Sequence, residues 1–206
     1  GYYGMEFVSI PADVVFRPAR VTPKPKILGS INARIDGGGD GKYAEIDPEG
    51  RYKVKVPFDL SDRGNGQASR FMRMAQPYAG GGMGMHFPLH KGTEVILTHV
   101  NGDPDRPMIA AAVPNPESGS PVKGGNSTQC AIQTGGGNKI VIEDSDGGQQ
   151  IKLSSPTQNT YFSIGAPNSP GNISLGSLGT MLSNLGGDNI FNAAGNELRE
   201  IAGTQS

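Results

Sequence analysis

The chain has 206 residues, of which only 35% are hydrophobic, while 32 are glycine and 16 are proline. Its formal net charge is −1 at neutral pH, so bulk charge does not indicate a phosphate-binding surface. The single Cys130 excludes an intrachain disulfide, and no apolar run has the length of a transmembrane helix or the form of a signal peptide. Many turn-forming residues between short apolar runs predict an all-β chain.

Residues 1–26 are predicted to be an extended linker that leads into the first domain. Its prolines disfavour a helix and favour extended backbone; they are Pro11, Pro18, Pro23 and Pro25. Basic residues between these prolines indicate a solvated linker, with a nucleic-acid-binding arm as the alternative; they are Arg17, Arg20, Lys24 and Lys26.

Residues 27–113 predict a small OB-fold-like β-barrel. Short apolar segments between turn residues indicate about six strands, and no segment has the pattern of a long helix. Seven apolar segments are the candidates for these strands, at 27–35, 43–46, 52–58, 71–74, 83–87, 93–100 and 108–113. Asp47-Pro48-Glu49-Gly50 predicts a type I turn between two of them. Residues 114–127 are rich in proline, glycine and serine and predict a second linker.

Residues 128–206 predict a repetitive β stalk, in which apolar pairs recur every 11 residues, most clearly over 138–178. The pairs are Ile140 and Ile142, Ile151 and Leu153, Phe162 and Ile164, and Ile173 and Leu175. One residue separates the two members of each pair, so each pair predicts a short strand with one apolar face. Residues 128–134 predict an irregular first repeat, and the period weakens beyond Gly179.

The repeat also predicts that several chains assemble. Each strand offers two apolar side chains, and a fully buried Ile or Leu contributes ~1.5–3 kcal/mol only if something covers that face. Eleven residues provide one strand and one connection, which is too little for the coil of a single-chain β-helix. We therefore predict a homotrimeric β-prism, or triple-stranded β-helix, with these apolar pairs at the shared axis. A sandwich of evenly spaced hairpins is the alternative.

Four motifs in the barrel and the stalk carry a family resemblance. They are the segments Asp47–Val56, Met74–Gly84, Gly102–Pro107 and Asn138–Asp144. With these motifs the chain resembles the VgrG family, which forms the trimeric spike of type VI secretion systems and related phage-tail-like machines. The run Gly102-Asp103-Pro104-Asp105-Arg106-Pro107 is the most specific of the four.

The resemblance implies a structural spike without enzymatic activity, catalytic residues, cofactor or metal. It implies a homotrimer whose partners are an inner-tube protein, a sharpened PAAR-like tip protein, hub and baseplate proteins, and effector cargo. The target membrane would be contacted mechanically, and no nucleic acid would be bound. Assembly on a baseplate in the bacterial cytoplasm, followed by ejection from the cell or into a target cell, is also implied.

Individual polar residues give no independent indication of catalysis. His86 and His90 are separated by Pro88 and lack a third metal ligand, so they predict ordinary surface or partly buried histidines. A second group, Asp103, Asp105 and Arg106, predicts either a local salt-bridged turn or a contact with a neighbouring subunit.

Two other functions remain as alternatives on the residues alone. An OB-fold nucleic-acid-binding module with a β-rich tail is the first, in which Tyr43, Tyr52 and Tyr78 would form a stacking platform. No basic groove accompanies these tyrosines, which favours a role in barrel packing. An accessory domain of a cell-wall hydrolase is the second alternative.

Overall fold

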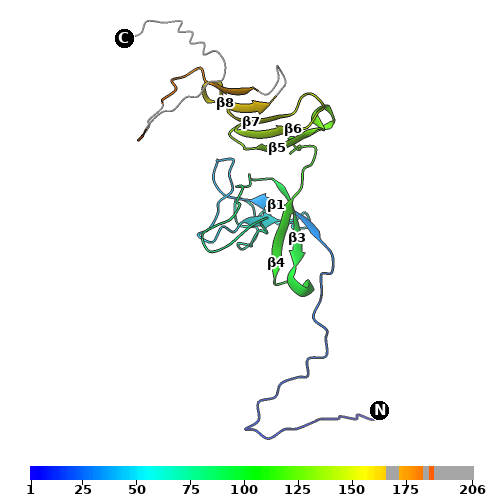
Figure 1. Ribbon diagram of the computed structural model, residues 1–206. Coiled ribbons are helices and arrows are strands. Elements are labelled where there is room, and N and C mark those ends of the chain that lie inside the picture. Colours follow the sequence, from blue (N-terminus) through cyan, green and yellow to red (C-terminus); the bar gives the residue numbers. More distant parts are fainter. Residues whose placement is uncertain (166–171, 183–185, 188–206) are drawn as a thin grey trace, which may run out of the picture. The chain divides into compact units, whose positions relative to one another are not determined.

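The computed structural model describes residues 1–165, 172–182 and 186–187, and it divides the chain into two compact units. Unit 1 comprises Gly1–Ser120 and unit 2 comprises Pro121–Ser206. Each unit contains one antiparallel sheet (Figure 1). Within the described ranges no helix has the length and apolar character needed to cross a membrane.

The sheet of unit 1 has the strand order β2-β1-β3-β4. These strands are β1 (Ile31–Asp36), β2 (Lys53–Lys55), β3 (Glu94–His99) and β4 (Pro107–Ala112). A short 3-10 turn, η1 (Val100–Gly102), follows β3. A β-turn is present at the predicted position, because the Gly50 amide donates to the Asp47 carbonyl over 2.9 Å.

The segment around Met72 closes this sheet into a barrel. Tyr52 directly precedes β2. The Met72 amide donates to the Tyr52 carbonyl over 2.7 Å, and the Tyr52 amide donates to the Met72 carbonyl over 3.0 Å. A few residues later, the Ile109 amide of β4 donates to the Arg73 carbonyl over 2.9 Å. The segment therefore connects the two outer strands of the sheet, which leaves neither with an open edge at this point.

The barrel core is small and apolar. Its buried residues are Ala33, Ile35, Ala44, Tyr52, Val54, Val95, Leu97 and Ile109. Tyr52 is fully buried and keeps its hydroxyl satisfied, because the oxygen lies 2.9 Å from His86 Nε2 and accepts from the Leu89 amide over 3.2 Å. Burial raises the pKa of Tyr52. The tyrosine belongs to the core, so it takes no part in an exposed stacking platform.

Three of the expected barrel strands are not formed as strands. Residues 43–46 contribute only an isolated bridge between Tyr43 and His90, and 83–87 only one between Ala79 and Gly84. Residues 71–74 contribute two isolated bridges, from Met72 and Met74. Glycines occupy four of the positions from 79 to 84, and a strand gains little from residues that have no side chain to pack. The first strand also begins later than expected, at Ile31.

Unit 2 contains a five-stranded antiparallel meander with the order β5-β6-β7-β8-β9 (Figure 1). The strands are β5 (Gln129–Gln133), β6 (Lys139–Glu143), β7 (Gln150–Ser155), β8 (Thr160–Gly165) and β9 (Ile173–Gly176). Short 3-10 turns, η2 (Gly124–Asn126) and η3 (Thr157–Asn159), precede β5 and β8. The expectation of an irregular first repeat was wrong, because all residues of β5 pair in register with β6. The predicted decay of the period beyond Gly179 falls largely outside the described residues.

Candidate functional site: the apolar face of the second sheet

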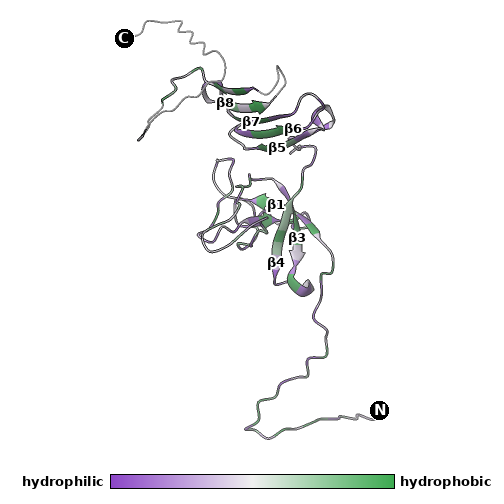
Figure 2. Cartoon of the chain, in the orientation of Figure 1, coloured by the Kyte–Doolittle hydropathy of each residue, from purple (hydrophilic) through white to green (hydrophobic). Residues whose placement is uncertain are grey.

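The strand register brings the predicted apolar pairs onto one face of the unit 2 sheet. Ile140 lies opposite Leu153, which in turn lies opposite Phe162, and Phe162 lies opposite Leu175. A second row runs through Ile142, Ile151, Ile164 and Ile173. Cys130 and Ile132 extend both rows onto β5. Figure 2 shows the resulting hydrophobic colouring along β5 to β8. We call these two rows the apolar face.

The apolar face is exposed, whereas the opposite face of the sheet is better covered. Its eight predicted members are between 37% and 70% exposed. The intervening residues on the other face include Ser163, which is only 7% exposed, and the half-buried Lys152 and Ser174. A soluble single-chain sheet normally shows the reverse pattern, with its apolar side covered.

Covering this face would yield a large stabilisation. Full burial of one Ile, Leu or Phe side chain contributes ~1.5–3 kcal/mol, and each of these residues has realised only part of that gain. Contiguous exposed apolar surface on soluble proteins marks interaction sites. The apolar face is therefore the candidate interaction surface of unit 2.

A polar network holds the first hairpin of this sheet. Glu143 accepts hydrogen bonds from the Thr128 hydroxyl, the Ser145 amide over 2.9 Å and the Gln129 side chain over 3.0 Å. These bonds, the one from Thr128 above all, lower the pKa of Glu143 to about 2. The carboxylate thereby ties the start of β5 to the turn that leads into β7.

Replacing Glu143 with Gln is expected to lower the thermal stability of the chain near neutral pH and to matter less near pH 2. A depressed pKa in the folded state adds stability above the ordinary pKa of 4.5, and this contribution is lost as pH falls toward about 2. Thermal unfolding of both chains over this pH range measures the effect. Asp146→Asn, in the exposed turn after β6, is the control, and an equal pH profile for the Glu143 variant and the parent chain would contradict the prediction.

The histidines and acidic residues noted in the sequence have structural partners. His86 bonds the Tyr52 hydroxyl, and His90 packs edge-on against Tyr43 with ring centroids 4.5 Å apart. No group of three or more metal-ligating side chains occurs among the residues that the structure describes.

The acidic turn is joined to the linker by an ion pair. Lys24 lies 2.7 Å from Asp103 and 3.6 Å from Asp105. The Lys24 bond is the main cause that lowers the pKa of Asp103, and the charge of Arg106 adds to it. Sequence reasoning missed Lys24 as the partner, because 79 positions separate it from Asp103 and no local pattern joins them.

Comparison with known proteins places both units in one family. A family model of the type VI secretion system/phage-baseplate injector OB domain matches residues 43–113. The spike protein VgrG4b of Pseudomonas aeruginosa is 33% identical over 72% of this chain, and VgrG1c of the same organism is 35% identical over 71%. The chain belongs to the VgrG spike family. It spans about a fifth of the length of these relatives, with matches that cover 19% and 21% of them.

One further relative and one solved structure are similar to this chain. A Vibrio cholerae relative named actin cross-linking toxin VgrG1 is 32% identical over 73% of this chain, a match that covers 14% of that VgrG protein. A chain of the lidded Francisella PdpA–VgrG complex aligns with a TM-score of 0.51, at 11% identity, over 81% of this chain and 28% of its own length. That likeness supports the all-β fold with an OB barrel.

Proposed function

We propose that this chain is the barrel-and-stalk segment of a homotrimeric spike in a contractile injection machine. The exposed apolar face of unit 2 is the observation that carries the proposal. Three copies, each contributing one sheet, would enclose the smallest shared core, with the rows of Phe162 and Ile164 turned toward the axis. Membership of the VgrG family supports this arrangement.

The proposed action is mechanical. Each strand of the stalk would be held by its neighbours along the chain through backbone hydrogen bonds and across the axis by two other chains. Such a rod resists buckling when it is driven against a membrane. Spike proteins among the relatives support a non-enzymatic role. An inner-tube protein, a tip protein, hub and baseplate proteins and effector cargo are the proposed partners. The spike is proposed to assemble in the bacterial cytoplasm and then to be ejected from the cell or into a target cell.

The mass of the chain in solution tests this proposal. Sedimentation equilibrium over a range of concentrations should give a trimer that dissociates only on dilution or denaturation, because stability of such an assembly depends on chain concentration. A chain that stays monomeric and folded at high concentration would refute the proposal. Nucleic-acid binding is not favoured, because Tyr52 is buried rather than available for stacking.

A further inference from the structure

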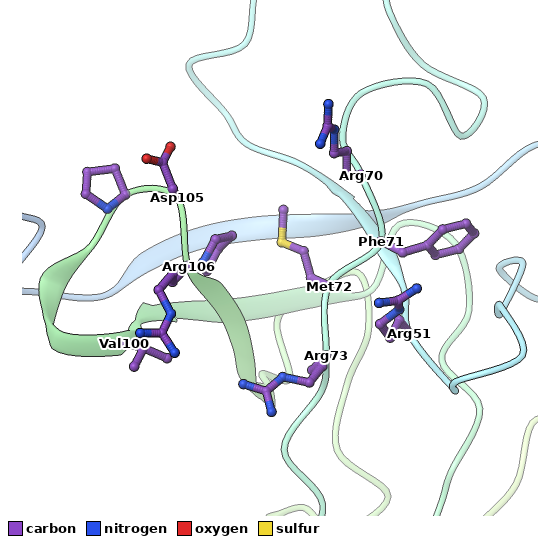
Figure 3. Close-up of a pocket in the computed structure, with 10 residues that line it drawn as sticks. Arg51, Arg70, Phe71, Met72, Arg73, Val100, Asp105 and Arg106 are labelled. Atoms are coloured by element: carbon purple, nitrogen blue, oxygen red, sulfur yellow. The ribbon is translucent and has the colours of Figure 1, made fainter.

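The surface of the barrel contains a hollow of about 470 Å³ surrounded by arginines. Arg51, Arg70, Arg73 and Arg106 line it, and we call it the arginine pocket (Figure 3). Its apolar lining includes Phe71, Met72 and Val100. Cavities of this size hold a few side chains or a small ligand.

The backbone under the arginines of the pocket is fixed by the barrel. Arg73 directly follows Met72, and Arg70 lies two residues before it; the Met72 amide and carbonyl bond Tyr52. The Arg73 carbonyl accepts from Ile109, and the Arg106 carbonyl accepts from Val100 over 3.0 Å. The backbone at Arg73 and Arg106 is therefore held by the barrel, so a ligand would not have to order it.

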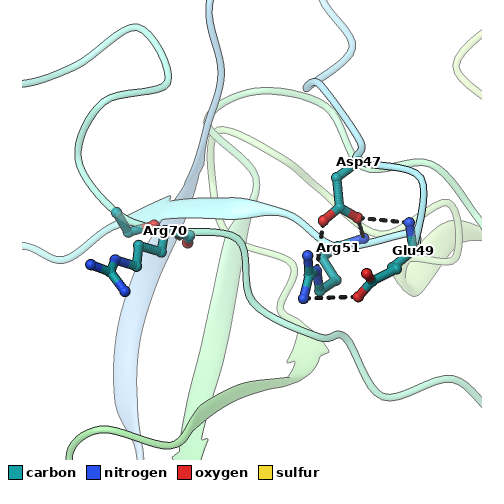
Figure 4. A network of polar contacts seen from close by, with 5 residues as sticks. Asp47, Glu49, Arg51 and Arg70 are labelled. Atoms are coloured by element: carbon teal, nitrogen blue, oxygen red, sulfur yellow. Dashed lines mark hydrogen bonds and ion pairs between the residues drawn. The ribbon is translucent and has the colours of Figure 1, made fainter.

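Only one of the arginines is neutralised. Arg51 lies 2.6 Å from Asp47 and 2.8 Å from Glu49, and these contacts raise the pKa of Arg51 (Figure 4). Burial opposes the lowering of the Asp47 pKa, but hydrogen bonds from the Arg51 amide and side chain outweigh it, so that pKa is lowered. Arg70 lies outside this network in the same view.

Three positive charges of the pocket thus remain without a close partner. Among the described residues, Arg70, Arg73 and Arg106 form no ion pair within 4 Å. The acidic residue of the lining, Asp105, lies 3.6 Å from Lys24 instead. Arg106 acts on Asp103 only as a longer-range charge.

We propose that the arginine pocket binds an acidic segment of a partner protein, in which carboxylate side chains alternate with apolar ones. Guanidinium groups pair with carboxylates through two parallel hydrogen bonds, and Phe71 and Met72 offer the apolar contact between them. A nucleic-acid strand fits less well, because the hollow is short, Asp105 stands in its lining and the tyrosines Tyr43 and Tyr78 lie outside it.

This site is independent of stalk assembly, because every lining residue belongs to unit 1. A chain that failed to form trimers would still carry the pocket. Binding and chain mass are therefore measured separately, so that failure of the proposed function and failure of this proposal give different results.

The test uses fluorescence anisotropy with the full chain and a short labelled peptide that alternates Asp and Leu. Saturable binding is expected, and Arg73→Glu and Arg106→Glu should each weaken it about tenfold. Arg63→Glu, an exposed arginine outside the pocket, makes the same charge change and should alter affinity less than about twofold. If circular dichroism shows that a glutamate variant is misfolded, Arg73→Gln and Arg106→Gln take its place. Each is expected to weaken the affinity for the acidic peptide about threefold.

Three outcomes would overturn the proposal. The first is equal binding of a peptide in which Asn replaces every Asp, since the arginines would then have no carboxylate to recognise. The second is tighter binding of labelled oligothymidylate than of the acidic peptide, which would assign the pocket to nucleic acid. The third is a change of chain mass in the Arg73 or Arg106 variants, which would show that the pocket faces a second copy of the chain.

Discussion

Replacing Phe162 with Asp is expected to leave the chain monomeric. Phe162 lies in the middle of the apolar face, opposite Leu153 on β7 and Leu175 on β9. In a trimer the substitution would place three carboxylates at the shared axis without cations to pair them. Desolvation of an unpaired carboxylate costs several kcal/mol per chain, and the lost burial of each phenylalanine removes ~1.5–3 kcal/mol more. Sedimentation equilibrium measures the result.

A matched control separates loss of assembly from loss of the sheet. Gln133→Asp introduces the same charge into β5 on the opposite face, next to Lys139 of β6, and should leave the trimer intact. Phe162→Leu keeps the apolar face and should also assemble. A Phe162→Asp chain that sediments as a trimer would remove this residue from the axis and with it the proposed arrangement of the stalk.

The stalk strands were the easiest part of the fold to predict from the sequence. Each apolar pair alternates with the residues between and around it, and a period of two specifies which side chains share a face of a strand. The strands β6 to β9 accordingly contain the predicted pairs. The covering of that face could not be observed in one chain, because the proposed occupants are other copies. The trimer axis through Ile140 and its counterparts stays a prediction.

The barrel was harder to predict, because its closure depends on single bridges between distant segments. Met72 was expected on a strand, but only its pairing with Tyr52 and that of Met74 with Ile109 join β2 to β4. No local pattern marks such bridges. The arginine pocket was missed for the same reason: Arg51, Arg73 and Arg106 come from three separate segments, and each looks ordinary in its own sequence context.

Replacing Ile109 with Ala is expected to destabilise the barrel by about 2–5 kcal/mol, since the deletion removes buried methyl groups and leaves a cavity. Ile109 is fully buried, and its backbone bonds both Arg73 and Ala75, so the side chain packs where the barrel closes. The chain has no tryptophan, and therefore urea unfolding followed by tyrosine fluorescence, to which the buried Tyr52 contributes, reports on the barrel. The midpoint should fall without a change in slope.

Val21→Ala is the control for this prediction. It removes methyl groups from a linker residue that is 85% exposed, and its unfolding midpoint should stay within error of the parent chain.

The Ile109→Ala variant also separates the roles of the two units. The apolar face lies wholly in unit 2, so Ile109→Ala should still sediment as a trimer under conditions where the barrel is folded. Loss of the trimer in that variant would mean that barrel contacts, and not the stalk rows alone, hold the three chains together.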